Sequence, residues 1–257
     1  LVGGYLSLIG GQTLIGVPRG SLVWSDTHSR QLIATGTNVK LYVTADTNYT
    51  PVDVTPWRLS AAGLADCIAT VNGSNVVTVQ YVGHAANVGE YLDISGAVAG
   101  NGVDPNGSWR VDSVIDADHV TFMAAAAASG TGVIGGGAVT IGFEIAPGLT
   151  DPAEGFGWGA GGWGEGTWGT PRSYTALSFS PRNWTLGNFG HILIGCPSDG
   201  AVYSYDPALF PAQRASRIAN APTTCTGVVV TSDKIVIAYG SNFDPDTNLA
   251  GGPSDQD

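Results

Sequence analysis

The sequence predicts an all-β protein made of partial β-propeller-like blades, with a small β-barrel or sandwich domain inserted between them. Short runs rich in Val, Ile, Thr and aromatic residues alternate with Gly, Asn, Asp and Ser, which is typical of strands joined by tight turns. The chain holds 38 Gly and 14 Pro, and is 43% hydrophobic but only 12% charged. This balance excludes a disordered chain. A helical pattern occurs only near 206–219, where we expect one short turn broken by Pro211.

The first predicted blade occupies residues 1–58. Strands are expected at 20–26, 31–36, 39–45 and 51–56, with polar turns such as "THSR" between them. Four short antiparallel strands in about forty residues is the size of one propeller blade. The segment therefore predicts a blade, with a generic antiparallel sandwich as the alternative.

A similar pattern returns at 183–257, which we assign to further blades. Residues 183–207 can be laid beside 21–45, since both run from a Trp-bearing strand to a strand that contains Tyr. "RIANAP" then takes the place of "PVDVTP", and 225–241 predicts a hairpin about Ser232-Asp233. These weak repeats favour consecutive blades.

The region between the two copies predicts an inserted β-domain at 59–146. Alternating strands are expected at 76–82, 91–96, 107–115, 119–124 and 138–145, and "NG" marks turns at 72–73 and 106–107. Insertions of this kind are tolerated at exposed loop tips. Residues 147–182 are then a Gly/Trp-rich connecting loop, and the two ends of the sequence suggest a longer chain.

The connecting loop carries the residues that we select as a candidate interface: Trp158, Trp163, Trp168 and Tyr174. The three tryptophans recur every five residues, and each is followed by Gly. Trp buries a large area at low rotamer cost and is frequent in interface hot spots. The rings are expected to fill a core within the chain or to dock on a neighbouring subunit, and sugar stacking is a third interpretation.

The net charge of −11 argues against a surface that binds DNA or RNA, because phosphate contacts need clustered Lys and Arg. An acidic wall still suits a conduit through which DNA slides without sticking. Cys67, Cys196 and Cys225 lack metal or CxxC spacing, so we expect them to be small buried residues. No apolar run is long enough to predict a membrane span.

No motif predicts catalysis, a metal or a cofactor, so we expect a protein that is not an enzyme. The four histidines, His28, His84, His119 and His191, lack metal spacing. Acidic segments at 46–53, 104–112 and 244–248 are interpreted as turns, with calcium binding as the alternative. Glu165 in the Trp loop leaves open a sugar-binding cleft or glycoside hydrolase.

Several segments, taken in order, resemble virion structural proteins of tailed bacteriophages. They are "GVPRGSLVWSDTHSRQLIATGTNVKLYV", "PVDVTP", "GFGWGAGGWGEGTWGTPRS", "RNWTLGNFGHILIGCPSDGAVYSYDP" and "NAP". In those proteins a similar Gly/Trp loop follows a β insert, which reads here "VGEYLDISGA" and "NGSWRVDSVIDADHVTF". The resemblance covers nearly the whole chain, and none of its motifs is catalytic.

The resemblance implies a tail nozzle or tail-tube component of a short-tailed phage, with β-propeller-like subunits in a ring around the DNA channel. The implied partners are copies of the chain itself, neighbouring tail or adaptor proteins, and viral DNA that passes without specific binding. The implied location is the virion tail, with the host cytoplasm during assembly. The alternatives are a carbohydrate- or receptor-binding tail protein, a glycoside hydrolase on a propeller, and a capsid or decoration protein.

Overall fold

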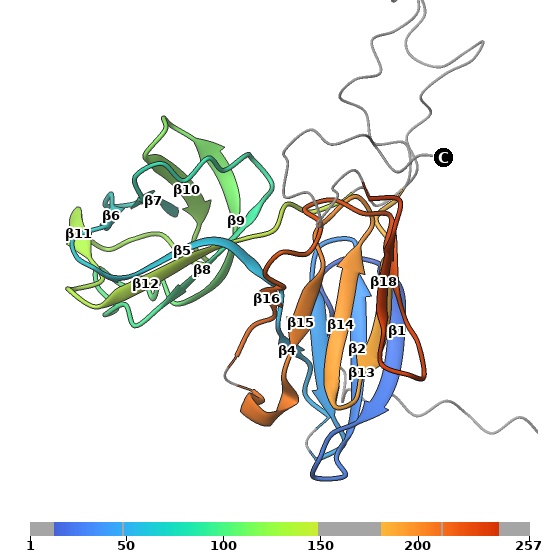
Figure 1. Cartoon of the computed structure of the whole chain (residues 1–257). Coiled ribbons are helices and arrows are strands. Elements are labelled where there is room, and N and C mark those ends of the chain that lie inside the picture. The colour runs from blue at the N-terminus through green and yellow to red at the C-terminus, as the bar shows by residue number, and fades with distance from the viewer. Residues whose placement is uncertain (1–12, 48, 149–180, 212, 242–257) are drawn as a thin grey trace, which may run out of the picture. The chain divides into compact units, whose positions relative to one another are not determined.

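The computed structural model describes residues 13–47, 49–148, 181–211 and 213–241, which form two compact units (Figure 1). The first unit joins the segment up to Val54 with the segment from Gly148 onward, and the second unit is Thr55–Pro147. Apart from one 3₁₀ turn at Pro207–Leu209 (η1), the regular structure of the described residues consists of strands. The prediction of an all-β protein is therefore confirmed, and no described helix is long and apolar enough to cross a membrane.

The first blade is a four-stranded antiparallel meander in chain order. Its strands are β1 (Pro18–Ser25), β2 (Gln31–Thr37), β3 (Leu41–Ala45) and β4 (Val52–Asp53). The third strand begins two residues later than the predicted 39–45, because the Thr37 hydroxyl accepts hydrogen bonds from the amides of Val39 and Lys40. These hydrogen bonds hold the backbone of Val39 and Lys40 in a turn, so the extended strand begins only after them.

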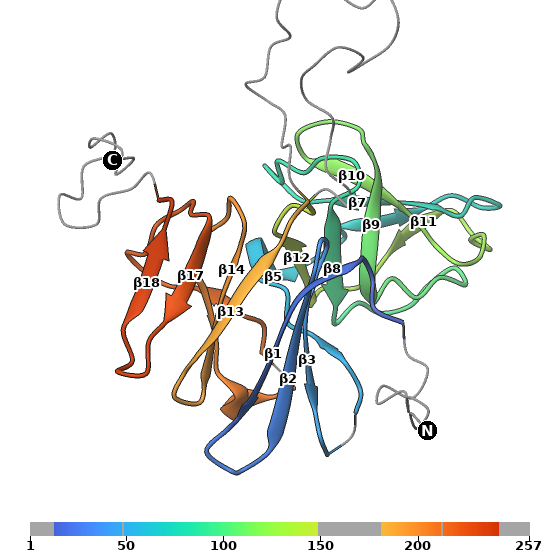
Figure 2. The ribbon, with the colours of Figure 1, turned by 90° about the vertical axis from the view of Figure 1, so that its right-hand side faces the viewer.

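The second blade repeats this order, and a hairpin starts a third. Its four strands are β13 (Trp184–Phe189), β14 (Ile192–Pro197), β15 (Tyr203–Tyr205) and β16 (Ser216–Arg217). The hairpin, called the third hairpin below, consists of β17 (Gly227–Val230) and β18 (Val236–Tyr239). The predicted short helical turn is η1, which Asp206 caps by accepting a hydrogen bond from the Ala208 amide. In Figure 2 the second-blade strands β13 and β14 lie between the hairpin β17–β18 on the left and the first-blade strands β1 and β2 on the right.

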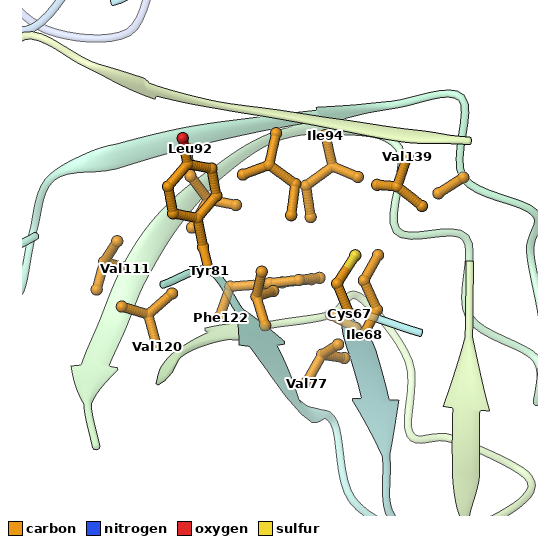
Figure 3. Close-up of a cluster of buried hydrophobic side chains, with 14 of the residues drawn as sticks. Cys67, Ile68, Val77, Tyr81, Leu92, Ile94, Val111, Val120, Phe122 and Val139 are labelled. Atoms are coloured by element: carbon orange, nitrogen blue, oxygen red, sulfur yellow. The ribbon is translucent and has the colours of Figure 1, made fainter. Parts of the chain in front are cut away.

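The inserted unit is one curled eight-stranded sheet of order β11-β6-β7-β10-β9-β8-β12-β5. Its strands are β5 (Trp57–Leu64), β6 (Ile68–Thr70), β7 (Val76–Gln80), β8 (Tyr91–Ser95), β9 (Gly107–Val114), β10 (His119–Met123), β11 (Gly132–Ile134) and β12 (Val139–Glu144). Curling brings the two halves of the sheet face to face. Leu92, Ile94 and Val139 then point toward Phe122 and Ile68 across an apolar interior (Figure 3).

The strands predicted within the insert at 76–82, 91–96, 107–115, 119–124 and 138–145 are present, each within two residues of its expected ends. Three strands that were not predicted, β5, β6 and β11, complete the sheet. β5 reads "WRLSAAGL", and its Ala and Gly have low strand propensity. Its pairing with β12 shifts register between Val139 and Ile141, so an irregular strand is held by its neighbour rather than by its own sequence.

Candidate assembly surface

The residues chosen from the sequence as an interface, Trp158, Trp163, Trp168 and Tyr174, lie outside the described residues, as does Glu165. The described residues contain other surfaces on which blades pack. These surfaces are built by two tryptophans, a set of glycines and an apolar hairpin, all within the first unit.

Trp184 forms the centre of the joint between the first and second blades. It begins β13, is 5% exposed, and its Nε1 donates a hydrogen bond to the Thr37 carbonyl at 2.7 Å. The indole lies directly on Gly36 of β2, where an added Cβ would overlap the ring. A Cβ on Gly20, the cross-strand neighbour of Gly36, would come within 3.2 Å of the Trp184 Cβ. Gly36 therefore makes room for the indole ring, and Gly20 makes room for the Trp184 backbone, whose carbonyl oxygen a Cβ at Gly20 would approach to 2.5 Å.

A second tryptophan secures the same joint from the opposite blade. Trp24 near the end of β1 is 5% exposed, and its Nε1 donates to the carbonyl of His191 at 2.9 Å. Each blade thus inserts one indole toward the other and satisfies its N–H on the other's backbone. Buried indole N–H groups need such a hydrogen-bond partner. The two tryptophans therefore fix the position of one blade against the other and also add buried area.

An ion pair between Asp26 and Arg30 stabilises the edge of this joint. Asp26 accepts hydrogen bonds from Arg30 Nε at 2.6 Å and from the amides of His28 and Arg30. Arg30 also donates through Nη2 to the carbonyl of Pro207, at the start of η1, at 2.8 Å. Burial raises the pKa of Asp26, but the hydrogen bonds from Arg30 and from the two amides outweigh this and hold the pKa below its ordinary value.

The third hairpin covers the other face of the second blade. The buried cluster there comprises Ile194, Cys196, Val202, Cys225 and Val228. The Val228 amide donates to Thr185 Oγ1 on β13 at 2.9 Å, which couples the edge of β17 to β13. Gly187 allows close approach, because a Cβ at this position would lie 2.7 Å from Cγ2 of Val230.

The opposite face of the third hairpin is apolar and exposed among the described residues. We call it the hairpin face, and it consists of Val229, Ile235, Ile237 and Tyr239. Val229 and Ile237 are a cross-strand pair and are 51% and 49% exposed, whereas the inward Val228 is 5% exposed. Contiguous apolar side chains on one sheet face are typical of an interaction surface. The hairpin face is therefore the strongest candidate assembly surface in the described part of the chain.

Other charged groups in the first unit hold structure together. Lys40 is 1% exposed and donates from Nζ to Asp53 at 2.6 Å, and Arg214 approaches the same carboxylate at 3.4 Å. Asp53 ends β4 and Arg214 precedes β16, so this group joins the last strands of two blades. Two cations share one partly buried carboxylate here, which assigns the group a structural role.

The inserted unit contains a shallow cavity of about 440 Å³. Its lining residues are Ala61, Leu64, Ala65, Cys67, Gln80, Tyr81 and Val82. Burial raises the pKa of Cys67 and of Tyr81, so both stay protonated at neutral pH. The lining carries no carboxylate, imidazole or amine, and it offers an apolar surface rather than an acid–base pair.

His84 and Asp104, which belong to the histidine and acidic sites considered in the sequence, have hydrogen-bond partners in the structure. His84 is 1% exposed, accepts from the Ala86 amide at Nδ1, and therefore donates from Nε2 to the Asp116 carbonyl at 3.0 Å. In the 104–112 segment, the Asp104 carboxylate accepts from Asn106, which forms the expected turn. The 244–248 segment lies outside the described residues.

Comparisons with known proteins give no family assignment. No family model and no curated protein matches the chain. Among solved structures, the phage phi92 endosialidase is similar to 82% of this chain, with 14% sequence identity and a TM-score of 0.29. The chain corresponds to 32% of the length of that protein, and a likeness of this degree assigns no function.

Proposed function

We propose that this chain is a structural, non-enzymatic protein of a bacteriophage tail, a subunit of a nozzle or tail-tube ring around the path of ejected DNA. The sequence resemblance to virion proteins of tailed phages motivates the class. The hairpin face is the observation that carries the assembly role. It presents apolar side chains on a sheet face, as the sheet faces that pack at the two joints within the unit do, but it has no described partner. We propose a neighbouring subunit as that partner.

Ring assembly follows from packing blade against blade. Within the unit, the first blade packs on the second, and the second packs on the third hairpin. Each element therefore packs on the one that follows it in the chain. A neighbouring subunit on the hairpin face would continue this series as a head-to-tail contact, and such contacts generate rings when the rotation closes. The acidic balance of −11 supports a lining over which DNA moves without binding.

Ile237→Glu tests the role of the hairpin face. A charge in the centre of an apolar contact costs several kcal/mol when it is desolvated, so we expect the average assembly mass measured by light scattering to fall toward that of a monomer. Val133→Glu is the matched control, because Val133 on β11 is exposed to a similar degree, 57%, and lies in the inserted unit. Its assembly mass should match that of the unsubstituted chain.

Two results would overturn the proposed role of the hairpin face. One is an assembly of unchanged mass in the Ile237→Glu variant, which would exclude a subunit contact there. The other is that the unsubstituted chain and the Ile237→Glu variant are both monomers, while only the Ile237→Glu variant has a lower unfolding midpoint. That result would show that a segment of the same chain covers this face.

A further inference from the structure

Two of the three cysteines meet inside the first unit, where the second blade joins the third hairpin. Cys196 lies on β14 and Cys225 lies two residues before β17, 29 positions further along the chain. Their exposed fractions are 0% and 1%, and their Sγ atoms are 3.1 Å apart. Cys67, the third cysteine, belongs to the inserted unit.

Backbone hydrogen bonds hold these two cysteines together independently of their sulfurs. The amide of Cys225 donates to the Gly200 carbonyl at 2.9 Å, and the Asp199 amide donates to the Cys225 carbonyl at 3.0 Å. The turn that contains Asp199 and Gly200 follows Cys196 directly, and the Gly200 amide closes it on the Pro197 carbonyl. The two chain segments are therefore fixed at bridging distance before any bond forms between the sulfurs.

The surroundings of the sulfurs also favour a bond between them. Both thiols reach the Gly200 carbonyl, at 3.6 Å from Cys196 and 3.5 Å from Cys225, so both point into the same small space. A disulfide bond is about 2.0 Å long, so the sulfurs need to approach by only about 1 Å. The Cys196 thiol also lies 3.3 Å from the Pro197 carbonyl and 3.7 Å from the Cys225 carbonyl. The apolar members of the surrounding buried cluster include Val202 and Val228.

We propose that Cys196 and Cys225 form an intramolecular disulfide when the chain meets a small-molecule disulfide such as oxidised glutathione. One cysteine loses its proton and attacks the glutathione disulfide, which gives a mixed disulfide and releases one glutathione thiolate. The second cysteine, also deprotonated, attacks the protein sulfur of that mixed disulfide and releases the second glutathione. Two protein thiols are oxidised, one glutathione disulfide is reduced, and the two protons end on the two released thiols.

Burial determines when this reaction occurs. Burial, followed by the hydrogen bond with Cys225, raises the pKa of Cys196, so its thiolate is scarce in the folded chain. Oxidation is therefore slow in the native protein and faster during folding or when the third hairpin opens. Once formed, the bond ties β14 covalently to the segment before β17, whether or not the chain assembles into rings.

The test compares the full chain refolded with a mixture of oxidised and reduced glutathione and the same chain refolded with dithiothreitol. Titration of thiols in denaturant should fall from three per chain to one, which is Cys67. Peptide mapping by mass spectrometry should find the 196–225 link in a monomeric chain. Cys67→Ser should fall from two thiols to none, and Cys225→Ala should form no internal link.

Three thiols in both refolded samples would overturn the proposal. A link that contains Cys67, or one that forms only between chains, would overturn it equally. These outcomes are measured on the unsubstituted chain, so they remain interpretable even if the Cys225→Ala variant fails to fold. Hydrogen exchange supplies a second readout, in which the amides of β17 should exchange more slowly in the oxidised chain than in the reduced one.

Discussion

At the scale of single residues, Gly36 is the clearest case of a position fixed by close approach. The Trp184 indole occupies the space where any other side chain would begin. Gly36→Val is expected to force the ring away and to lower the free energy of unfolding by about 1–3 kcal/mol, the usual cost of overpacking. Urea denaturation followed by Trp fluorescence measures this change.

Gly137→Ala provides the control for that experiment. Nothing lies within 4 Å of a Cβ at Gly137, so its unfolding midpoint should stay close to that of the unsubstituted chain. If Gly36→Val is as stable as this control, the packing of Trp184 against β2 does not hold the two blades together.

Asp26 predicts a dependence of stability on pH. Its folded pKa lies below the ordinary carboxyl value of 3.8, so the ionised form is favoured in the folded state. The stabilisation is complete well above pH 3.8 and is lost as the pH falls through the lower folded pKa. The unfolding free energies of the unsubstituted chain and of Asp26→Asn should therefore differ at pH 7 and converge in acid. A difference that does not change between pH 7 and pH 2.5 would contradict the role of the Asp26 charge.

At the scale of elements, the attachment of the third hairpin depends on Thr185. Thr185→Val removes the acceptor for the Val228 amide while preserving shape, and we expect a loss of about 1–2 kcal/mol. Hydrogen exchange should show the loss first at β17, as local opening of the hairpin rather than of the whole unit. Equal acceleration at β2 and β17 would show that the hairpin does not open separately.

The sequence predicted the regular strands better than the irregular ones. Runs such as 76–82 and 119–124 alternate apolar and polar residues, so their period alone identifies them. β5 and β11 are short of β-branched residues or flanked by glycine, and only pairing within the curled sheet makes them strands. Pairing between distant segments does not appear in local composition.

The candidate surfaces were harder to predict. The blade joint depends on Trp184 meeting Gly36, two residues 148 positions apart, and no local pattern connects them. The hairpin itself was predicted about Ser232-Asp233, and its two strands are present. Its apolar outward face was visible as "VVV" and "IVI", but that pattern equally fits a strand buried on both sides. The interface chosen from the sequence, the Trp loop, stays a prediction.

At the scale of the whole molecule, we predict a role in assembly or folding for the three tryptophans of the Gly/Trp-rich loop. Replacing Trp158, Trp163 and Trp168 by Ala together should weaken assembly or folding, because each buried ring contributes about 2–3 kcal/mol through its area. Light scattering and thermal unfolding of the triple variant separate the two effects. If neither changes, the rings do not anchor the chain to itself or to a neighbour.

The same loop separates the structural proposal from a carbohydrate-active one. A tail nozzle or tube subunit should show no binding on a glycan array, and Glu165→Gln should leave assembly unchanged. Binding to a defined glycan that is lost in Glu165→Gln would move the assignment to a sugar-binding or sugar-cleaving tail protein.

The most direct test of the central claim is the mass and symmetry of the native assembly, measured by native mass spectrometry and cryo-electron microscopy of the unsubstituted chain. The proposal predicts a closed ring whose subunits meet at the hairpin face of Val229 and Ile237. A chain that remains monomeric over the full accessible concentration range, or a ring in which the hairpin face is exposed to solvent, would contradict it.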